Sequence, residues 1–478
     1  MAFLTRRKPL TAQTEHDESR RLKATLSWWH LVAMGVGAIV GTGIYTLTGI
    51  GAGMAGPGVI LSFAMCGAVC TCAALCYAEM ATAIPKAGSA YTYSYALLGE
   101  LPAWIVGWSL ILEYTVAAAA VAVGWSGYVA QMIHGMGLQV PESVLHGAMA
   151  GGILDLPAVL ISAAVAGLLI VGTRESAMVT AILVAVKLTA LLLFVVLALR
   201  HFDSANFQPF MPFGFASTTD AAGHARGVMA AAALVFFAFY GFDTVSTASE
   251  ETRNPNRDLK IGIIGSMALS TTIYILVAVA ALGASYYTVF SKADAPLAFI
   301  LSALGHPMAS QVVSAAAVVA LPSVILVLMY GQSRIFFVMA RDGLLPHALS
   351  AVSASRHTPV LMTVVTGAIV AALASTLRLD EIALLANAGT LCAFIAVALC
   401  VLMMRIFHPA HERSFRAPWP WLVAPVCIVG CGYLFLAGLP GFTQTWFVGW
   451  NAFGLLIYFL YGARKSLLAR TAQPRNPG

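Results

Sequence analysis

Two short runs of residues interrupt apolar, membrane-length stretches of this chain with groups that could bind ions. The first is Gly-Val-Gly-Ala-Ile-Val-Gly-Thr-Gly-Ile at residues 35–44, and the second is Phe-Phe-Ala-Phe-Tyr-Gly-Phe-Asp at residues 236–243. Each run predicts a membrane helix that is broken near its middle. A break frees main-chain N–H and C=O groups, which hydrocarbon cannot satisfy, so it is tolerated only beside protein or a wet cavity. Freed amides attract anions and freed carbonyls attract cations, which makes each break a candidate binding site.

Two charged residues, Lys187 and Glu113, stand in the middle of other apolar stretches. A charge at this depth costs about 3 kcal/mol on insertion scales and marks a functional position by default. An apolar surrounding favours the neutral amine, so Lys187 could change its protonation during a cycle. The alternative is a fixed structural cation paired with carbonyls of the first break. Glu113 could meet a cationic ligand, carry a proton, or hydrogen-bond to Tyr114 or a neighbouring helix.

The composition predicts an all-α integral membrane protein. Of the 478 residues, 60% are hydrophobic and only 10% are charged, against roughly 25% charged in an average soluble domain. Apolar windows of about 20 residues predict about twelve transmembrane helices. They lie near residues 29–51, 58–84, 102–132, 154–171, 175–199, 227–250, 259–287, 308–340, 359–376, 380–405, 419–438 and 442–462.

The placement of Lys and Arg predicts the orientation. With the N-terminus inside, the outer connections hold only Arg200, Arg226, Lys292 and Arg378 of the 26 basic residues. The positive-inside rule therefore predicts both termini in the cytoplasm of a cell with this protein in its inner or plasma membrane. The first 27 residues are polar and charged, so no cleavable signal peptide is expected. The net charge of +6 needs no nucleic-acid partner, because orientation explains it.

We expect one membrane domain at residues 28–463, between cytoplasmic tails at 1–27 and 464–478. The first broken helix opens the chain, and the second opens a new set of five spans. Residues 29–199 and 227–405 are therefore predicted to be inverted repeats, with two additional helices at 419–462. A longer outer loop is expected near 200–226, and a polar re-entrant or surface stretch near 290–306.

Covalent chemistry is not expected. The spacing Gly35-x-Gly37-x-x-x-Gly41 lacks the preceding strand and the later acidic residue of a dinucleotide site. The eight cysteines lie in predicted spans among Ala, Gly, Val and Leu, where they read as small packing residues and not as metal ligands. No nucleophile with a histidine partner is recognisable. The sequence therefore predicts no enzyme, no cofactor and no metal site.

Several motifs together resemble those of amino-acid permeases in the amino acid–polyamine–organocation superfamily. They are Gly-Ala-Ile-Val-Gly-Thr-Gly-Ile-Tyr at 37–45, Glu79 followed by Ile-Pro-Lys-Ala-Gly-Ser-Ala-Tyr-Thr-Tyr at 84–93, and Glu-Glu-Thr-Arg-Asn-Pro-Asn-Arg-Asp at 250–258. The runs at 110–114, 124–128, 331–334 and 342–346 are similar to the cationic amino acid transporter branch and its bacterial relatives. One departure is Lys260, where many relatives carry proline.

The resemblance implies a five-plus-five inverted repeat with helices 1 and 6 broken. It also implies that a substrate carboxylate meets the amides around Ile39, Thr42 and Gly43, with the Thr42 hydroxyl assisting. The substrate ammonium would meet carbonyls of Phe237, Ala238 and Tyr240. Lys187 matches proton-driven relatives, which carry a lysine where sodium-driven cousins bind sodium.

The acidic residues near the inner face have two interpretations. Glu79, Asp243 and the Glu250 cluster could form an intracellular ion-pair gate with Arg253, Arg257 or Lys260, or they could be solvated loop charges.

These observations predict a secondary transporter that imports L-amino acids through the lipid bilayer by alternating access, with protons as the coupling ion. Glu113 is counted among the substrate-binding residues, and a cationic or neutral substrate and the oligomeric state stay open. Three alternatives are an exchanger with Lys187 as a fixed cation, a non-transporting amino-acid sensor, and an integral-membrane enzyme. A sensor would need a long cytoplasmic domain, and an enzyme would need a catalytic pair.

Overall fold

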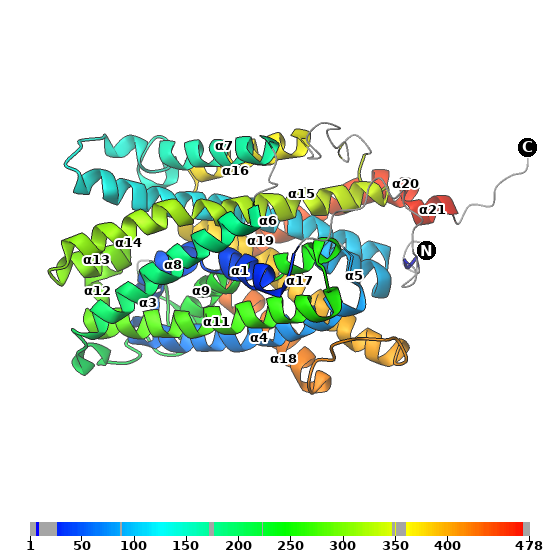
Figure 1. Cartoon of the computed structure of the whole chain (residues 1–478), viewed down its shortest axis with the longest axis horizontal. Coiled ribbons are helices and arrows are strands. Elements are labelled where there is room, and N and C mark those ends of the chain that lie inside the picture. The colour runs from blue at the N-terminus through cyan, green and yellow to red at the C-terminus, as the bar shows by residue number, and fades with distance from the viewer. Residues whose placement is uncertain are drawn as a thin grey trace, which may run out of the picture.

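The computed structural model describes residues 6–8, 26–86, 88–171, 176–221, 223–346, 349 and 360–471. Most of the predicted tails, at 1–27 and 464–478, lie outside these ranges. The described chain is a bundle of long helices that run along one axis of the molecule (Figure 1). A mostly helical membrane fold is thereby confirmed.

The first half of the bundle contains only helices. They are α1 (Trp28–Ile39), α2 (Thr42–Tyr45), α3 (Leu47–Ala55), η3 (Gly56–Gly58), α4 (Val59–Ala83), α5 (Ser89–Leu97), α6 (Glu100–Gly135), η4 (Glu142–Val144), η5 (Ala148–Ala150), α7 (Leu156–Val171) and α8 (Ser176–Leu199).

The connection to the second half contains η6 (Ser204–Phe207) and a short antiparallel hairpin of β1 (Thr218–Thr219) and β2 (Ala225–Arg226). The helices that follow are α9 (Val228–Val235), η7 (Phe236–Phe239), α10 (Thr244–Thr247), η8 (Ser249–Glu251), α11 (Pro255–Ala284), α12 (Tyr287–Phe290), α13 (Pro296–Ala303), α14 (Pro307–Ala320), α15 (Pro322–Arg341), α16 (Val360–Thr376) and α17 (Leu379–Phe407). The C-terminal part adds α18 (Pro420–Tyr433), η10 (Leu434–Gly438), α19 (Gly441–Ile457), η11 (Tyr458–Gly462), α20 (Ala463–Lys465) and α21 (Leu467–Thr471).

Helical segments occupy every apolar window predicted from the sequence. Within the described ranges, nine helices are long and apolar enough to cross a membrane, and three apolar helices are shorter: Trp28–Ile39, Leu156–Ile170 and Val360–Thr376. The shortest of these, α1, ends where the first break begins. The predicted stretch near 290–306 is largely helical, because it contains α13, which packs against α14 and α8.

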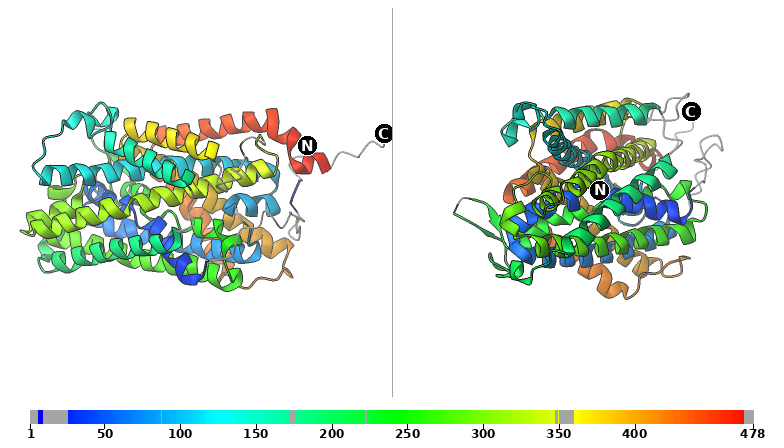
Figure 2. Two further views of the ribbon diagram at one scale, coloured as in Figure 1. Left: turned by 45° about the horizontal axis from the view of Figure 1, so that its top comes forward. Right: turned by 60° about the vertical axis from the view of Figure 1, so that its left-hand side comes forward.

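The broken helices lie in the interior of the bundle. Helix α1 packs against α11, α8 and α15, while α9 packs against α3 and α4. Close approach depends on small residues: a Cβ on Gly35 would overlap the Ser266 side chain, and one on Gly262 would overlap Leu31. Helices α7 and α16 pair with each other at the edge of the bundle (Figures 1 and 2).

Both ends of the described chain meet at one end of the bundle (Figure 2). The Arg6 guanidinium donates to the carbonyl of Ala463, 3.0 Å away, and lies 3.5 Å from the Glu100 carboxylate. Lys8 forms an ion pair of 2.7 Å with Asp342, which follows α15. Helices α12 and α13 lie at the opposite end (Figure 1).

Candidate functional site

The first break separates α1 from α2 by two residues. Val40 and Gly41 leave the helical conformation, with φ and ψ of −76° and 89° at Val40 and of −134° and −151° at Gly41. In the described chain, no acceptor is found for the main-chain N–H groups of Thr42 and Gly43, and the buried Thr42 hydroxyl also has no partner. The predicted break is therefore present, and it presents unpaired donors at the start of α2.

The second break is a 3₁₀ turn followed by extended backbone. Helix α9 gives way to η7, Tyr240 is extended with ψ of 146°, and Gly241 has φ of +112°. Only glycine adopts this φ without strain, so Gly241 fixes the position of the break. All residues from Phe236 to Asp243 are buried.

The two breaks are in direct contact. A Cβ on Gly43 would overlap Ala238, and a Cβ on Gly241 would lie 2.9 Å from the Ala38 carbonyl carbon. Tyr274 of α11 joins them as well, because its hydroxyl lies 2.7 Å from the carbonyl oxygens of both Ile39 and Ala238. A hydroxyl has one proton, so it donates to one of these carbonyls at a time.

Tyr274 was not among the residues predicted from the sequence. The only signal was that Tyr274 is the one tyrosine of α11, and a membrane tyrosine packs or faces lipid as often as it binds. The structure thus brings Ile39, Thr42, Gly43 and Ala238 together. Phe237 and Tyr240 also belong to the second break, and their rings stack with centroids 6.0 Å apart.

Lys187 lies behind the first break and is fully buried. Its ammonium donates to the carbonyl oxygens of Gly37 and Val40, at 2.8 and 3.0 Å. In return, the Tyr45 hydroxyl donates to the Lys187 carbonyl at 3.1 Å. Helix α8 is therefore attached to both sides of the break by hydrogen bonds in both directions.

Glu113 belongs to a different buried cluster. In the part of the chain that the structure describes, neither of its oxygens accepts a hydrogen bond, so the bond to Tyr114 that the sequence suggested is not formed. The Tyr114 hydroxyl instead donates to Asp243 Oδ2 at 2.6 Å, and the Tyr114 ring lies 6.1 Å from that of Tyr240. Glu113 packs against α17, because a Cβ on Gly389 would lie 2.8 Å from the Glu113 Cβ, and within the described chain no hydrogen bond or ion pair joins Glu113 to Lys187.

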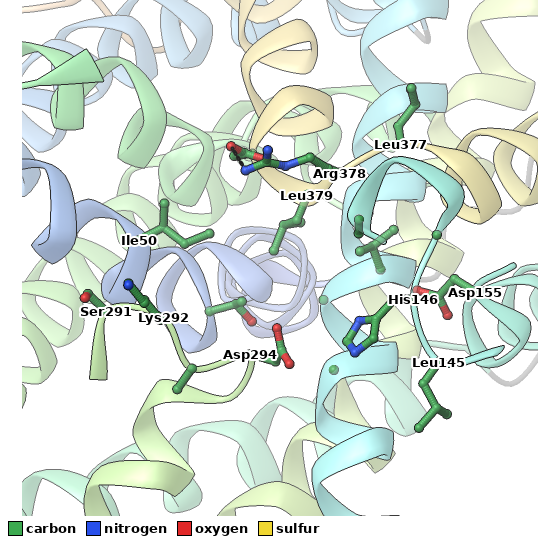
Figure 3. A pocket seen from close by; sticks show the side chains of 18 residues that line it. Ile50, Leu145, His146, Asp155, Ser291, Lys292, Asp294, Leu377, Arg378 and Leu379 are labelled. Carbon is green, nitrogen blue, oxygen red and sulfur yellow. Dashed lines mark hydrogen bonds and ion pairs between the residues drawn. The ribbon is translucent and has the colours of Figure 1, made fainter. Parts of the chain in front are cut away.

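A cavity of about 300 Å³ lies near the loop between α12 and α13, at the end of the bundle away from α20 (Figure 1). Figure 3 shows side chains that line it. Of the lining residues, we call Thr46 and Gly124, which lie next to Thr42 of the first break, the floor, and we call Asp155, Asp294 and Arg378 part of the wall. Gly124 also faces Thr42, because a Cβ there would overlap the Thr42 side chain. One wall residue, Asp155, accepts hydrogen bonds from Ser126 Oγ at 2.5 Å and from the Ala158 N–H at 3.0 Å.

Charged contacts gather on the opposite side of the breaks. Glu251 pairs with Arg334 of α15 at 3.3 Å and also accepts from the Tyr330 hydroxyl at 2.6 Å. Glu79 is bound by Arg405 at 2.8 Å and by Arg413 at 3.1 Å. The expected partners Arg253, Arg257 and Lys260 are therefore wrong for both Glu79 and Glu251. The side chain of Glu251 turns toward α15, and that of Glu79 pairs with residues at and after the end of α17.

The remaining candidate groups are unremarkable chemically. The eight cysteines are free thiols, buried or half-buried. Within the described ranges, no three His, Cys, Asp or Glu side chains come together as a metal site.

Comparison with known families gives evidence that is independent of this arrangement of two touching breaks and a buried lysine. The family model described as amino acid permease matches residues 26–461. The chain belongs to the amino acid permease family. This match covers all helices from α1 to α19, so the permease is a transporter and a multi-pass membrane protein, and not an enzyme.

Curated relatives of the permease are similar over nearly the whole chain. The branched-chain amino acid permease BcaP of Bacillus subtilis is 42% identical, over 96% of this chain and 97% of its own. The methylthioribose transporter of the same organism is 39% identical, over 98% of this chain and 100% of its own. The vacuolar cationic amino acid transporter 2 of Arabidopsis thaliana is 37% identical, over 86% of this chain and 64% of its own. The resemblance to the superfamily and to its cationic branch is thus confirmed.

Proposed function

We propose that this permease imports L-amino acids by alternating access and couples their entry to protons. The observation that carries the proposal is the contact between the two breaks, where unpaired donors at Thr42 and Gly43 lie against the carbonyl-bearing turn at Ala238. An amino acid is a zwitterion, so its site needs donors and acceptors side by side. Main chain freed by two breaks supplies both without a charged side chain.

In this proposal the substrate carboxylate meets the N–H groups of Thr42 and Gly43 and the Thr42 hydroxyl. The substrate ammonium meets carbonyls of the second break at Phe237, Ala238 and Tyr240. Because the Tyr274 hydroxyl lies at hydrogen-bond distance from the Ala238 carbonyl, the ammonium must displace or share this bond. When the substrate ammonium binds the Ala238 carbonyl, the Tyr274 hydroxyl can still donate its hydrogen bond to the Ile39 carbonyl. The hydrogen bond of Tyr274 is therefore expected to change when substrate binds.

Lys187 is proposed as the coupling residue. Proton loss from its ammonium weakens its hold on the carbonyls of Gly37 and Val40, which lie on the two sides of the turn out of α1. A change in the strength of these two hydrogen bonds can shift the equilibrium between two positions of α1. A permanently charged Lys187 would give the alternative, an exchanger, since both carbonyls are also suitable partners for a fixed cation.

Localisation follows from the charge distribution. We propose an inner or plasma membrane protein with both termini in the cytoplasm and the 300 Å³ cavity facing outward. The predicted inverted repeats at 29–199 and 227–405 belong to the same proposal. A C-terminal tag that is cut by protease added outside intact cells would contradict this orientation.

The deciding experiment is uptake of a panel of radiolabelled amino acids into proteoliposomes, with and without an imposed pH gradient. Alanine, leucine and arginine are the test substrates, and methylthioribose is the competitor without a carboxylate or an ammonium. We expect amino-acid accumulation that grows with the pH gradient, weaker inhibition by alaninamide than by alanine, and no replacement of protons by sodium. Binding without uptake would favour a sensor, and uptake indifferent to the gradient but dependent on internal amino acid would favour an exchanger.

A further inference from the structure

The cavity near the loop between α12 and α13 contains polar groups that the proposed central site does not use. Thr46 is only 4% exposed, and among the residues that the structure describes its hydroxyl has no hydrogen-bond partner, although Thr46 lines the cavity. A buried hydroxyl without a partner costs free energy unless a ligand or water satisfies it. Thr46 therefore points to a polar ligand on the cavity floor.

The floor lies one helical turn above the proposed central site. The Thr46 N–H donates to the Thr42 carbonyl at 2.8 Å, so the two threonines are consecutive turns of the same broken helix. A Cβ on Gly124 would lie 3.5 Å from Thr46 Oγ1 and would overlap Thr42, so Gly124 keeps α6 close to both. Thr46 therefore lines the cavity one helical turn from Thr42, which is not among the lining residues.

The wall supplies one carboxylate that is not engaged elsewhere. Asp380 is paired with Arg378 at 3.2 Å, and Asp155 accepts hydrogen bonds from Ser126 and from the Ala158 N–H. In the described chain Asp294 has no ion pair or hydrogen bond, and its side chain is exposed. In Figure 3, Asp294 and His146 lie on facing sides of the central space, and Arg378 lies at its edge.

The position of Asp294 is fixed although its carboxylate is free. A Cβ on Gly127 of α6 would lie 3.2 Å from the Asp294 Cβ and 3.4 Å from its carbonyl oxygen, so the residue packs directly against α6. Lys292 lies in the same loop and lines the cavity as well. The cavity thus offers a free carboxylate on the wall and a free hydroxyl on the floor.

We propose that this cavity is an outer binding subsite for an incoming amino acid, in which Asp294 receives the ammonium group and the Thr46 hydroxyl receives the carboxylate. The carboxylate then enters first and has only one helical turn to travel to the donors at Thr42. This inference rests on the proposed function, since it takes the same class of ligand. It differs from the central site in using side chains, which retain the ligand weakly and release it quickly.

The test combines equilibrium binding and transport of labelled alanine. The purified full-length protein should bind alanine in a tight phase and a second, weaker phase. Asp294→Asn and Thr46→Val should each remove the weaker phase and keep the tight one. In proteoliposomes, Asp294→Asn should raise KM by about threefold with kcat unchanged, as expected for loss of a solvent-accessible ion pair.

The matched control is Asp220→Asn, because Asp220 belongs to the outer hairpin, does not line the cavity and pairs with Arg226 at 3.0 Å. It should change neither binding phase nor KM. Thr46→Val keeps the test decisive if Asp294→Asn does not fold. Normal uptake and both binding phases in Asp294→Asn and Thr46→Val would overturn the subsite and leave the proposed function standing.

Two further results would separate a failure of the outer subsite from a failure of the proposed function. In the first, potassium chloride displaces the weaker phase as well as alanine does, and choline chloride does not. This result would identify an inorganic-cation site and overturn the amino-acid assignment. An absence of amino-acid uptake by the wild type would instead overturn the proposed function.

Discussion

The Lys187 ammonium lies 2.8 Å from the Gly37 carbonyl oxygen and 3.0 Å from that of Val40, across the end of α1. Both oxygens lie where the helical ladder of α1 ends, so an unbroken helix would bond them internally. The lysine thereby satisfies carbonyls that hydrocarbon could not, and the break in turn satisfies a buried ammonium. These two hydrogen bonds join Lys187 to the break, and they are the reason that Lys187 is proposed as the coupling residue.

Lys187→Ala should abolish accumulation driven by a pH gradient while retaining measurable substrate binding. The substrate is proposed to contact α2 and the second break, and Lys187 lies behind α1, so the binding groups stay in place. Proteoliposome uptake should stop at equilibrium, and scintillation-proximity binding of labelled alanine should persist. Lys465→Ala is the control, because this exposed lysine of α20 does not line the cavity. If Lys187→Ala concentrates alanine as well as the wild type does, proton coupling by Lys187 is refuted, and only its role as a fixed structural cation remains.

Gly43→Ala should destabilise the permease, because the added Cβ overlaps Ala238 of the second break. Overpacking of this kind costs about 1–3 kcal/mol and should lower Tm by about 5 °C. Alanine binding should weaken as well, since the two breaks must separate. Thermal unfolding of the detergent-solubilised protein measures the first effect. Gly167→Ala is the matched control, because nothing lies within 4 Å of a Cβ there. Equal Tm values for the two variants would refute the close contact.

Glu113→Gln tests whether the buried carboxylate selects the substrate side chain. Because its oxygens have no hydrogen-bond partner, we expect the substitution to leave alanine uptake largely intact. Any competition of arginine and lysine with labelled alanine should disappear, since it would depend on the Glu113 charge. Glu142→Gln, at an exposed glutamate, should keep that competition. Loss of alanine uptake in Glu113→Gln would instead favour proton transfer by Glu113.

Asp155 should make stability depend on pH. It lies just before α7, outside the span, and burial raises its pKa from 3.8 to about 6. Hydrogen bonds from Ser126 and from the Ala158 N–H, and the nearby His146, oppose this rise, and Asp294 adds to it. Because the folded state holds the proton more tightly, this stabilisation is complete below about pH 4 and is lost as the pH rises through about 6.

Asp155→Asn does not titrate, so the difference in Tm between wild type and this variant isolates the effect. That difference should fall by about 3 °C between pH 5 and pH 7.5. Differential scanning of the purified protein at both pH values measures it. A difference that is constant with pH, or that grows as the pH rises, would contradict the raised pKa.

The sequence by itself determined the apolar segments and the places where they break. Membrane spans are local patterns of composition, so each predicted window coincides with a helix. The break at Gly41 and the one at Gly241 were also visible, because helix packing alone does not explain a threonine between two glycines, or a carboxylate near a glycine, in the middle of a span. The buried Lys187 stood out for the same local reason.

Tertiary structure alone decided which groups face one another. Tyr274 joins Ile39 and Ala238 from residues 235 and 36 positions away, and Glu251 turns to Arg334 and not to its sequence neighbours. Thr46 and Asp294 line one cavity although about 250 residues separate them in the sequence. Such pairings depend on how helices pack across the bundle, and the energy of one side-chain contact leaves no local pattern in the sequence.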